Sequence, residues 1–329
     1  MKGIKHPSND QTLNPSGNRS IHDVIDSVDG SRRTFIKGSA GASALAAAGG
    51  LTLSGLVTTV EAAPVPASLG FPGIGFDSVP AMLAPVADRV TVPTGYTAEL
   101  FVAWGDAIMP GAPAFAPDAS NTAAEQARQY GTHTDGMHFF PFTGTDGKPT
   151  NDRGILCANN EYTHEEILTT TGNAVLDIAK VRKSQAAHGV AILEARRRNG
   201  KWMVVKNSPY GRRLTANTRM RVSGPAAGHA LMKSKVYSIT DTGSVPTGEL
   251  SDGFTAYGTI NNCANGVTPW GTYLACEENW NGTFGSFTPL PSAAASETGK
   301  LFNRYGVTAT GFGYNWHTVD PRFDVNLNP

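Results

Sequence analysis

The sequence has little charge of either sign, and this shortage already excludes some functions. Charged side chains make up 16% of its 329 residues, against about 25% in ordinary globular proteins. The 27 basic and 27 acidic residues cancel, so no net field draws the chain toward nucleic acid or an anionic membrane surface. We therefore expect no nucleic-acid partner.

Cysteines are also scarce, and the common patterns of catalytic and metal-binding residues are missing. Three cysteines, Cys157, Cys263 and Cys276, exclude a disulfide framework, although one bridge with a third free thiol stays open. The sequence has no CxxC or HExxH pattern for zinc and no GxSxG turn for a nucleophilic serine. Its glycine-rich stretch at 224–229 lacks the lysine of a phosphate-binding loop. These patterns therefore give no support to a zinc enzyme, a serine hydrolase or a P-loop protein.

Long amphipathic helices are missing as well. Only residues 122–130 and 174–183 have a helical pattern, each about two or three turns long. Short β-prone runs bounded by Gly, Pro and Asn dominate instead, and a hydrophobic share of 40% can bury a sizeable core. We expect strands at 98–102, 154–157, 190–196, 201–206, 235–239, 254–260 and 272–276, with Asn199-Gly200 turning a hairpin. This spacing is typical of a mainly β protein.

The N-terminal region has the pattern of a targeting signal. Arg32-Arg33 precedes an uncharged stretch at 38–60 whose weak hydrophobicity argues against a permanent membrane anchor. Small residues around Ala62 offer a cleavage site. We predict that residues 1–62 are a twin-arginine signal peptide, read by the twin-arginine translocase, and that the folded protein reaches the periplasm or the extracellular space. The alternative is an exposed arginine pair before an alanine-rich core helix.

The export prediction has a direct test. Replacing both Arg32 and Arg33 by lysine removes the pair that the translocase reads, so the precursor should stay in the cytoplasm. Cell fractionation measures this, and unchanged export of the variant would refute the signal.

Two segments of the sequence, at 154–161 and 271–279, have a similar residue pattern. In each, a strand that begins at glycine reaches a cysteine and then carboxylate and amide side chains. The separation of Glu161 and Glu277 equals two or three propeller blades at ~40–50 residues each. Chance similarity of short strands is the alternative.

The ends of these two strands carry the candidate metal ligands. Asn160 and Glu161 offer the oxygen ligands that calcium prefers. Cys263, with Glu277 and Glu278 a strand later, offers a thiolate and carboxylates that suit iron, with one carboxylate free to bridge to a second metal. The alternatives are a polar turn for the first pair, and a buried structural cysteine with a solvated glutamate pair for the second group.

These features together resemble one known family. Besides the arginine leader, the segments that carry the resemblance are 133–141, 159–162, 187–190, 223–229, 262–278 and 316–322. In this order they resemble the PhoX family of secreted bacterial alkaline phosphatases, from the leader to the end of the chain.

The resemblance implies a six-bladed β-propeller over residues 63–329 that holds a cofactor of Fe3+ and Ca2+ in its central channel. It also implies the hydrolysis of small-molecule phosphate monoesters, with ligands from Asn160, Glu161 and Glu277. We favour Cys263 as the iron ligand, because the other two cysteines lie inside expected strands where alternation can turn them away. The candidate metal ligands are therefore Asn160, Glu161, Cys263, Glu277 and Glu278.

Family members continue beyond the last residue of this chain, so we expect a partial propeller without its closing blades. Such a ring exposes a strand edge and leaves the metal site incomplete, so we expect the chain to hydrolyse little or no phosphate ester by itself. We also expect it to be a monomer. Two other functions stay open. One is a calcium-stabilised propeller that binds a ligand without turnover, and the other is a propeller hydrolase acting on phosphodiesters or lactones.

Overall fold

The computed structural model describes residues 77–79, 90–172 and 175–328. Residues Thr97–Pro329 form a compact unit, and all the elements below belong to it. The predicted signal peptide at 1–62, including Arg32 and Arg33, lies outside the described residues and stays a prediction. In the described part of the chain, no helix has the length and apolar character needed to cross a membrane.

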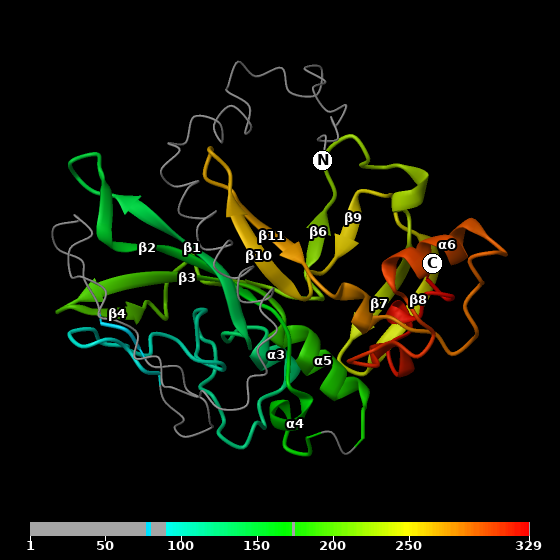
Figure 1. Cartoon of the computed structure of the whole chain (residues 1–329), viewed down its shortest axis with the longest axis horizontal. Coiled ribbons are helices and arrows are strands. Elements are labelled where there is room, and N and C mark those ends of the chain that lie inside the picture. The colour runs from blue at the N-terminus through cyan, green and yellow to red at the C-terminus, as the bar shows by residue number, and fades with distance from the viewer. Residues whose placement is uncertain (1–76, 80–89, 173–174, 329) are drawn as a thin grey trace, which may run out of the picture. The chain divides into compact units, whose positions relative to one another are not determined.

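The largest element of this unit is an antiparallel five-stranded sheet (Figure 1). Its strands follow the order β1-β2-β3-β4, and β5 pairs with β3 beyond the end of β4. Their bounds are β1 Thr134–Thr143, β2 Pro149–Asn160, β3 Gly189–Arg198, β4 Lys201–Val204 and β5 Arg212–Leu214. One buried cluster includes Ala158, Ala191 and Leu193, joined by Ile108 and Tyr130, so the centre of the sheet forms a core.

The hairpin between β3 and β4 confirms the turn predicted from the sequence. Asn199 and Gly200 both have left-handed backbone, with φ of 51° and 80°. Two such residues in succession give the turn twist that matches paired strands, and Asn-Gly adopts it at little cost.

The other strands form three antiparallel pairs within the described residues. They are β6 Arg219–Arg221 with β9 Thr255–Tyr257, β7 Lys235–Thr240 with β8 Gly243–Leu250, and β10 Asn262–Val267 with β11 Tyr273–Glu277. The β10–β11 pair lies between the five-stranded sheet and the β6–β9 pair (Figure 1). The mainly β prediction is confirmed, and the described strands form open sheets, not a closed ring.

Helices are short throughout the described residues. The α-helices are α3 Ala123–Gln126, α4 Glu165–Leu168, α5 Ile178–Ala187 and α6 Glu297–Tyr305. The 3-10 turns are η1 Ala230–Met232, η2 Trp280–Thr283, η3 Trp316–Thr318 and η4 Pro321–Phe323. Figure 1 shows α3, α4 and α5 gathered near one end of the five-stranded sheet.

Several predicted boundaries are wrong, and capping explains two of them. The helix predicted at 174–183 begins only at Ile178, because Asp177 accepts a hydrogen bond from the Lys180 N–H and caps it. The helix predicted at 122–130 is confined to α3, capped by Thr122. Helix α6 was not predicted from the sequence, although Ser296 caps its start and Gly306, with φ of 67°, ends it.

Two predicted strands are also corrected. Residues 98–102 form no strand. Phe101 and Val102 pack against the core cluster, so their apolar character reflects burial without backbone pairing. The strand predicted at 254–260 is reduced to Thr255–Tyr257, because its only partner strand, β6, is equally short.

Candidate metal centre

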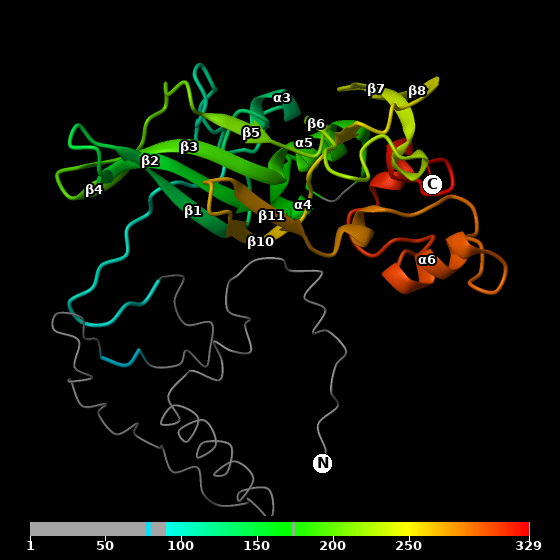
Figure 2. The same ribbon diagram turned by 90° about the horizontal axis from the view of Figure 1, so that it is seen from above.

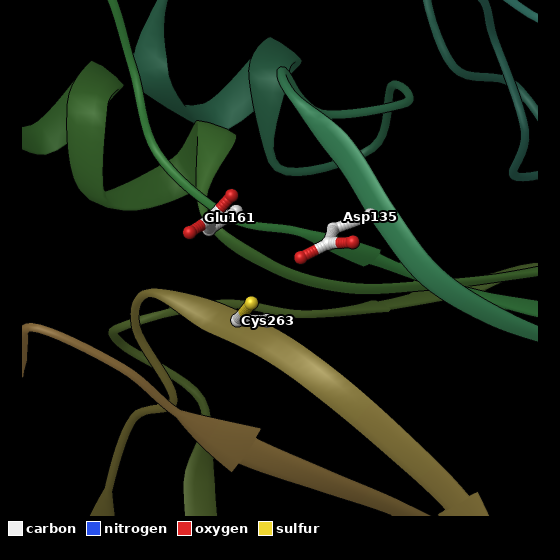
Figure 3. Close-up of side chains that lie close together, drawn as sticks. All are labelled: Asp135, Glu161 and Cys263. Atoms are coloured by element: carbon white, nitrogen blue, oxygen red, sulfur yellow. The ribbon is translucent and has the colours of Figure 1, made fainter. Parts of the chain in front are cut away.

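Three side chains that are far apart in the sequence meet beside the β1–β2 and β10–β11 hairpins. One carboxylate oxygen each of Asp135 and Glu161 and the sulfur of Cys263 all lie within 4.8 Å of one another. Figure 3 shows Asp135 on β1 and Cys263 on β10 pointing toward the same space, with Glu161 at its edge. Sequence reasoning proposed Glu161 and Cys263 as ligands but missed Asp135, which lies in a segment used there only for the family resemblance.

Asp135 and Cys263 lie in two β-bulges of the same form. Between positions 134 and 137, β1 has one residue more than the facing part of β2. Between positions 262 and 265, β10 has one residue more than the facing part of β11. An extra residue bends its strand and redirects the side chains beside it. Both hairpins therefore direct a potential ligand at one cluster.

The backbone around each bulge repeats as well. His133 and Asn261 precede the two bulges, and both have left-handed backbone, with φ of 47° and 48°. Their carbonyl oxygens accept hydrogen bonds from the backbone N–H groups of Glu161, at 2.9 Å, and Glu278, at 2.8 Å. The similarity between segments 154–161 and 271–279 thus reflects a repeat of local structure, in which Glu278 is the counterpart of Glu161.

The two hairpins approach closely because of Gly136. A Cβ on Gly136 would lie 2.7 Å from both the Cys263 carbonyl oxygen and Oδ1 of Asn265, so a larger residue would push β10 away. Asn159 then joins the hairpins, since its Nδ2 donates to the Cys263 carbonyl oxygen at 2.6 Å and its Oδ1 accepts from the Tyr273 hydroxyl at 2.9 Å. Figure 2 shows the β10–β11 hairpin lying beside β1. Asn159 therefore fixes where Cys263 lies.

The cluster has the electrostatics of a cation site. Burial raises the pKa of Glu161, and the charges of Asp135 and Glu278 raise it further. Hydrogen bonds to Asp135 and Glu278 raise the pKa of the Cys263 thiol to about 12, because the thiol donates only while protonated. A bound cation reverses both shifts, since it stabilises the carboxylate and the thiolate.

Two of the residues predicted as ligands, Glu277 and Asn160, make their hydrogen bonds elsewhere. Glu277 Oε1 accepts hydrogen bonds from the Thr259 hydroxyl, at 2.9 Å, and from the Ile260 N–H, at 3.0 Å. Asn160 is fully buried, and its Oδ1 accepts from Arg213. Among the described residues, Glu277 does not belong to the ligand group around Cys263.

The other two cysteines lie outside the cluster. Cys157 packs in a buried cluster with Val190 and Ile192. Cys276 is exposed. The structure places neither of them in the ligand group, as far as the described residues extend.

A pocket of about 610 Å³ adjoins the cluster, and Glu161 lies in both. Its wall includes Tyr314, whose hydroxyl accepts from the Thr163 N–H at 3.2 Å and lies 3.2 Å from His188 Nε2. His188 Nδ1 lies 2.8 Å from the Ser184 carbonyl oxygen, which can only accept. Nδ1 therefore carries the proton, and the Tyr314 hydroxyl donates to Nε2.

The His188 contact predicts loss of stability in acid. Burial lowers the pKa of His188 from 6.5 to about 4, although the Ser184 carbonyl opposes this. Because the unfolded chain binds this proton first, about 3 kcal/mol of stability is present above pH 6.5 and is lost as the pH falls toward 4. We expect His188→Gln to lose this part of the pH dependence in urea unfolding at pH 7, 5.5 and 4. An unchanged pH dependence in the variant, or titration of His188 near 6.5 by NMR, contradicts the prediction.

Comparisons with known proteins cover most of the chain. The family profile described as Alkaline phosphatase PhoX matches residues 75–329. A solved structure, Pseudomonas fluorescens PhoX in complex with vanadate, a transition state analogue, is similar at 40% sequence identity with a TM-score of 0.66. That match covers 78% of this chain and 40% of the other, so this chain spans well under half the length of the solved protein. None of the curated proteins compared with the chain matches it.

Proposed function

The chain belongs to the PhoX family of alkaline phosphatases, and from that premise we propose that Asp135, Glu161 and Cys263 form part of a metal-dependent site that hydrolyses phosphate monoesters. One observation carries the proposal: three potential ligand atoms lie within 4.8 Å of one another in a member of a phosphatase family. Glu278, whose charge acts on Glu161 and whose carboxylate hydrogen-bonds to the Cys263 thiol, is the fourth member of the proposed site.

The chemistry of the donor set fits iron and calcium. A thiolate suits iron, and carboxylate oxygens suit both iron and calcium. Asp135, Glu161 and Cys263 would hold these ions, with Glu278 beside them. Acidic groups at such close range are costly without a cation, and the raised pKa values of Glu161 and Cys263 express that cost.

When bound, such ions neutralise phosphoryl oxygens and favour in-line attack by water. The residues of this chain hold the metal ligands in position and leave a pocket through which an ester can reach them. The two bulges direct Asp135 and Cys263 at one point, and Asn159 holds the β10 backbone there. Because Glu161 also lines the adjoining pocket, an ester in that pocket lies next to the cluster.

The proposal has two levels, because the chain spans 40% of the solved relative's length. Hydrolysis of phosphate monoesters is proposed for the whole protein. Binding of the metal ions, and of phosphate through these ions, is proposed for this chain of 329 residues.

The test is calorimetric titration of the chain with Fe3+ and Ca2+, followed by inorganic phosphate. We expect phosphate to bind only after the ions and to be released by a chelator. Glu161→Gln should weaken both steps. Glu277→Gln is the matched control, because its carboxylate is bonded to the 259–260 loop and glutamine keeps an acceptor there.

Three results would count against the proposal. They are phosphate binding without metal, no phosphate binding with metal, or equal effects of the two variants. If the whole protein binds phosphate but releases no p-nitrophenol from p-nitrophenyl phosphate, the function is ligand binding without turnover.

A further inference from the structure

Arg213, in the middle of β5, is a buried cation without an acidic partner. Its side chain belongs to none of the ion pairs among the described residues, and burial lowers its pKa from 12.5 to about 10. Charged side chains are seldom buried unless they are paired, because removing a charge from water is costly. Other groups must therefore compensate the guanidinium.

Helix α5 supplies part of this compensation. Nη2 of Arg213 donates to three successive carbonyl oxygens, those of Ala186 at 3.0 Å, Ala187 at 3.3 Å and His188 at 2.8 Å. These groups lie at the C-terminal end of α5, where no further turn of helix satisfies them and where the helix dipole favours a cation. Arg213 therefore caps α5, and the cap fixes the place of the guanidinium.

The other arm of the guanidinium reaches β2. Nη1 of Arg213 donates to Oδ1 of Asn160, which is the last residue of β2 and is completely buried. Successive side chains of a strand point to opposite faces. Asn159 bonds to the β10 backbone on one face, and Asn160 turns to Arg213 on the other. Glu161 follows on the side of the cluster, so its direction depends on how the end of β2 is held.

The same contact reaches the start of β1. Asn160 pairs with Thr134 in the register of the sheet, and Asp135 follows Thr134 as Glu161 follows Asn160. A Cβ on Gly131 would lie 2.6 Å from Cγ of Asn160, so the chain that enters β1 packs directly against this side chain. A shift of Asn160 would therefore displace both strands next to the cluster.

We propose that Arg213 and Asn160 are positioning residues of the metal centre: their hydrogen bond anchors the paired ends of β1 and β2 to α5 and so holds Glu161 and Asp135 in place. The inference rests on the proposed function, since it requires the cluster to bind cations. Asn160, predicted from the sequence as a ligand, acts in this arrangement through Glu161, because its Oδ1 is occupied by Arg213. Groups that orient metal ligands in this way typically change the metal affinity by about 10- to 100-fold.

The experiment measures the affinities of the chain for Ca2+ and Fe3+ by calorimetric titration, at a temperature where circular dichroism shows each variant folded. Asn160→Leu removes the acceptor and should weaken the binding of both ions at least about tenfold. Asn160→Asp keeps an acceptor for Arg213 and should retain the parent affinities. Leu193→Ala is the control for lost stability, because Leu193 lies fully buried in the core of the sheet. It should also retain the parent affinities.

A second variant separates the anchor from the helix cap. Arg213→Lys keeps the charge and a donor for the carbonyl oxygens of α5, but an ammonium does not replace the planar fork that joins them to Asn160. It should therefore fold and still weaken the binding of both ions about tenfold. At saturating Fe3+ the thiolate-to-iron absorption should remain, because Asn159 holds the backbone of Cys263 by a separate hydrogen bond.

The outcomes separate the two proposals. If the parent chain binds neither ion, both are overturned. If the parent binds the ions and Asn160→Leu and Arg213→Lys bind them equally tightly, the inference is overturned and the proposed function stands. If Leu193→Ala weakens the binding as much as these variants do, or if Arg213→Lys abolishes the absorption, the effect is a general loss of structure and the inference is again overturned.

Discussion

Replacing Cys263 by serine is expected to lower the affinity of the chain for Fe3+ by roughly 100-fold or more, with little effect on folding. Cys263 is the only sulfur in the ligand group of the described residues, and a serine hydroxyl does not replace a thiolate as an iron ligand. Its side chain is only partly buried, so the substitution removes no core packing. The parent chain with iron should also show thiolate-to-iron absorption in visible light, and the variant should not.

Two controls make the result specific. Cys276→Ser changes an exposed thiol of β11, and Cys157→Ser changes a thiol in the core of the sheet. Neither should alter the iron affinity or the visible absorption, although Cys157→Ser should lower stability. Equal iron affinity in Cys263→Ser and the parent chain would remove Cys263 from the proposed site.

The sequence predicted those parts of the fold and of the site whose signal is local. The hairpin at 199–200 and the strands now seen as β2, β7 and β11 have turn and alternation signals within a few residues. The echo between 154–161 and 271–279 identified the strand ends beside the cluster. It did so because the two hairpins repeat a backbone pattern, with a bulge opposite each echoing strand.

The parts that it missed depend on pairing between distant segments. Asp135 becomes a potential ligand only because a bulge in β1 turns it toward Cys263, and the bulge is a property of the register with β2. The same register explains why Glu278, not Glu277, acts on the cluster, since Glu278 repeats the backbone contact of Glu161. Glu277 and Glu278 were both predicted as ligands, because the sequence does not show where the strand ends. Only the end of the strand decides which of the two neighbouring carboxylates faces the cluster.

The burial of polar side chains could not be predicted from the sequence either. Helix α5 carries Lys180, Arg182 and Lys183, all of them buried. In a sequence this pattern indicates a solvated helix face. Lys180 donates to the nearby Gly172 carbonyl oxygen, but Lys183 and Arg182 find their partners far along the chain. The most important of these partners is Asp320, which pairs with Arg182. Asp320 lies in the segment 316–322, which contributed to the family resemblance without any assigned role.

Asp320 is the centre of a buried charge network. It is completely buried, and its Oδ2 lies 2.5 Å from Arg182 Nη1, 2.9 Å from Arg322 Nη2 and 3.0 Å from Gln185 Nε2. Burial opposes ionisation, but the hydrogen bonds and charges of Arg322 and Arg182 outweigh it and hold the pKa of Asp320 below its usual range. Arg182 also donates to the Thr240 carbonyl oxygen, so the network joins α5 to β7 and to the C-terminal segment.

Replacing Asp320 by alanine should therefore destabilise the fold by about 3–5 kcal/mol, because it leaves buried guanidinium charge without its partner. Urea unfolding at pH 7 measures the loss. Glu297→Ala is the control, since its ion pair with Lys300 is exposed at both side chains and should contribute less than about 1 kcal/mol. The double variant Arg182→Met with Asp320→Leu should recover part of the loss, because it removes the Arg182 charge together with that of Asp320 and leaves only Arg322 without its partner. If Asp320→Ala costs no more than Glu297→Ala, Asp320 does not hold α5, β7 and the C-terminal segment together.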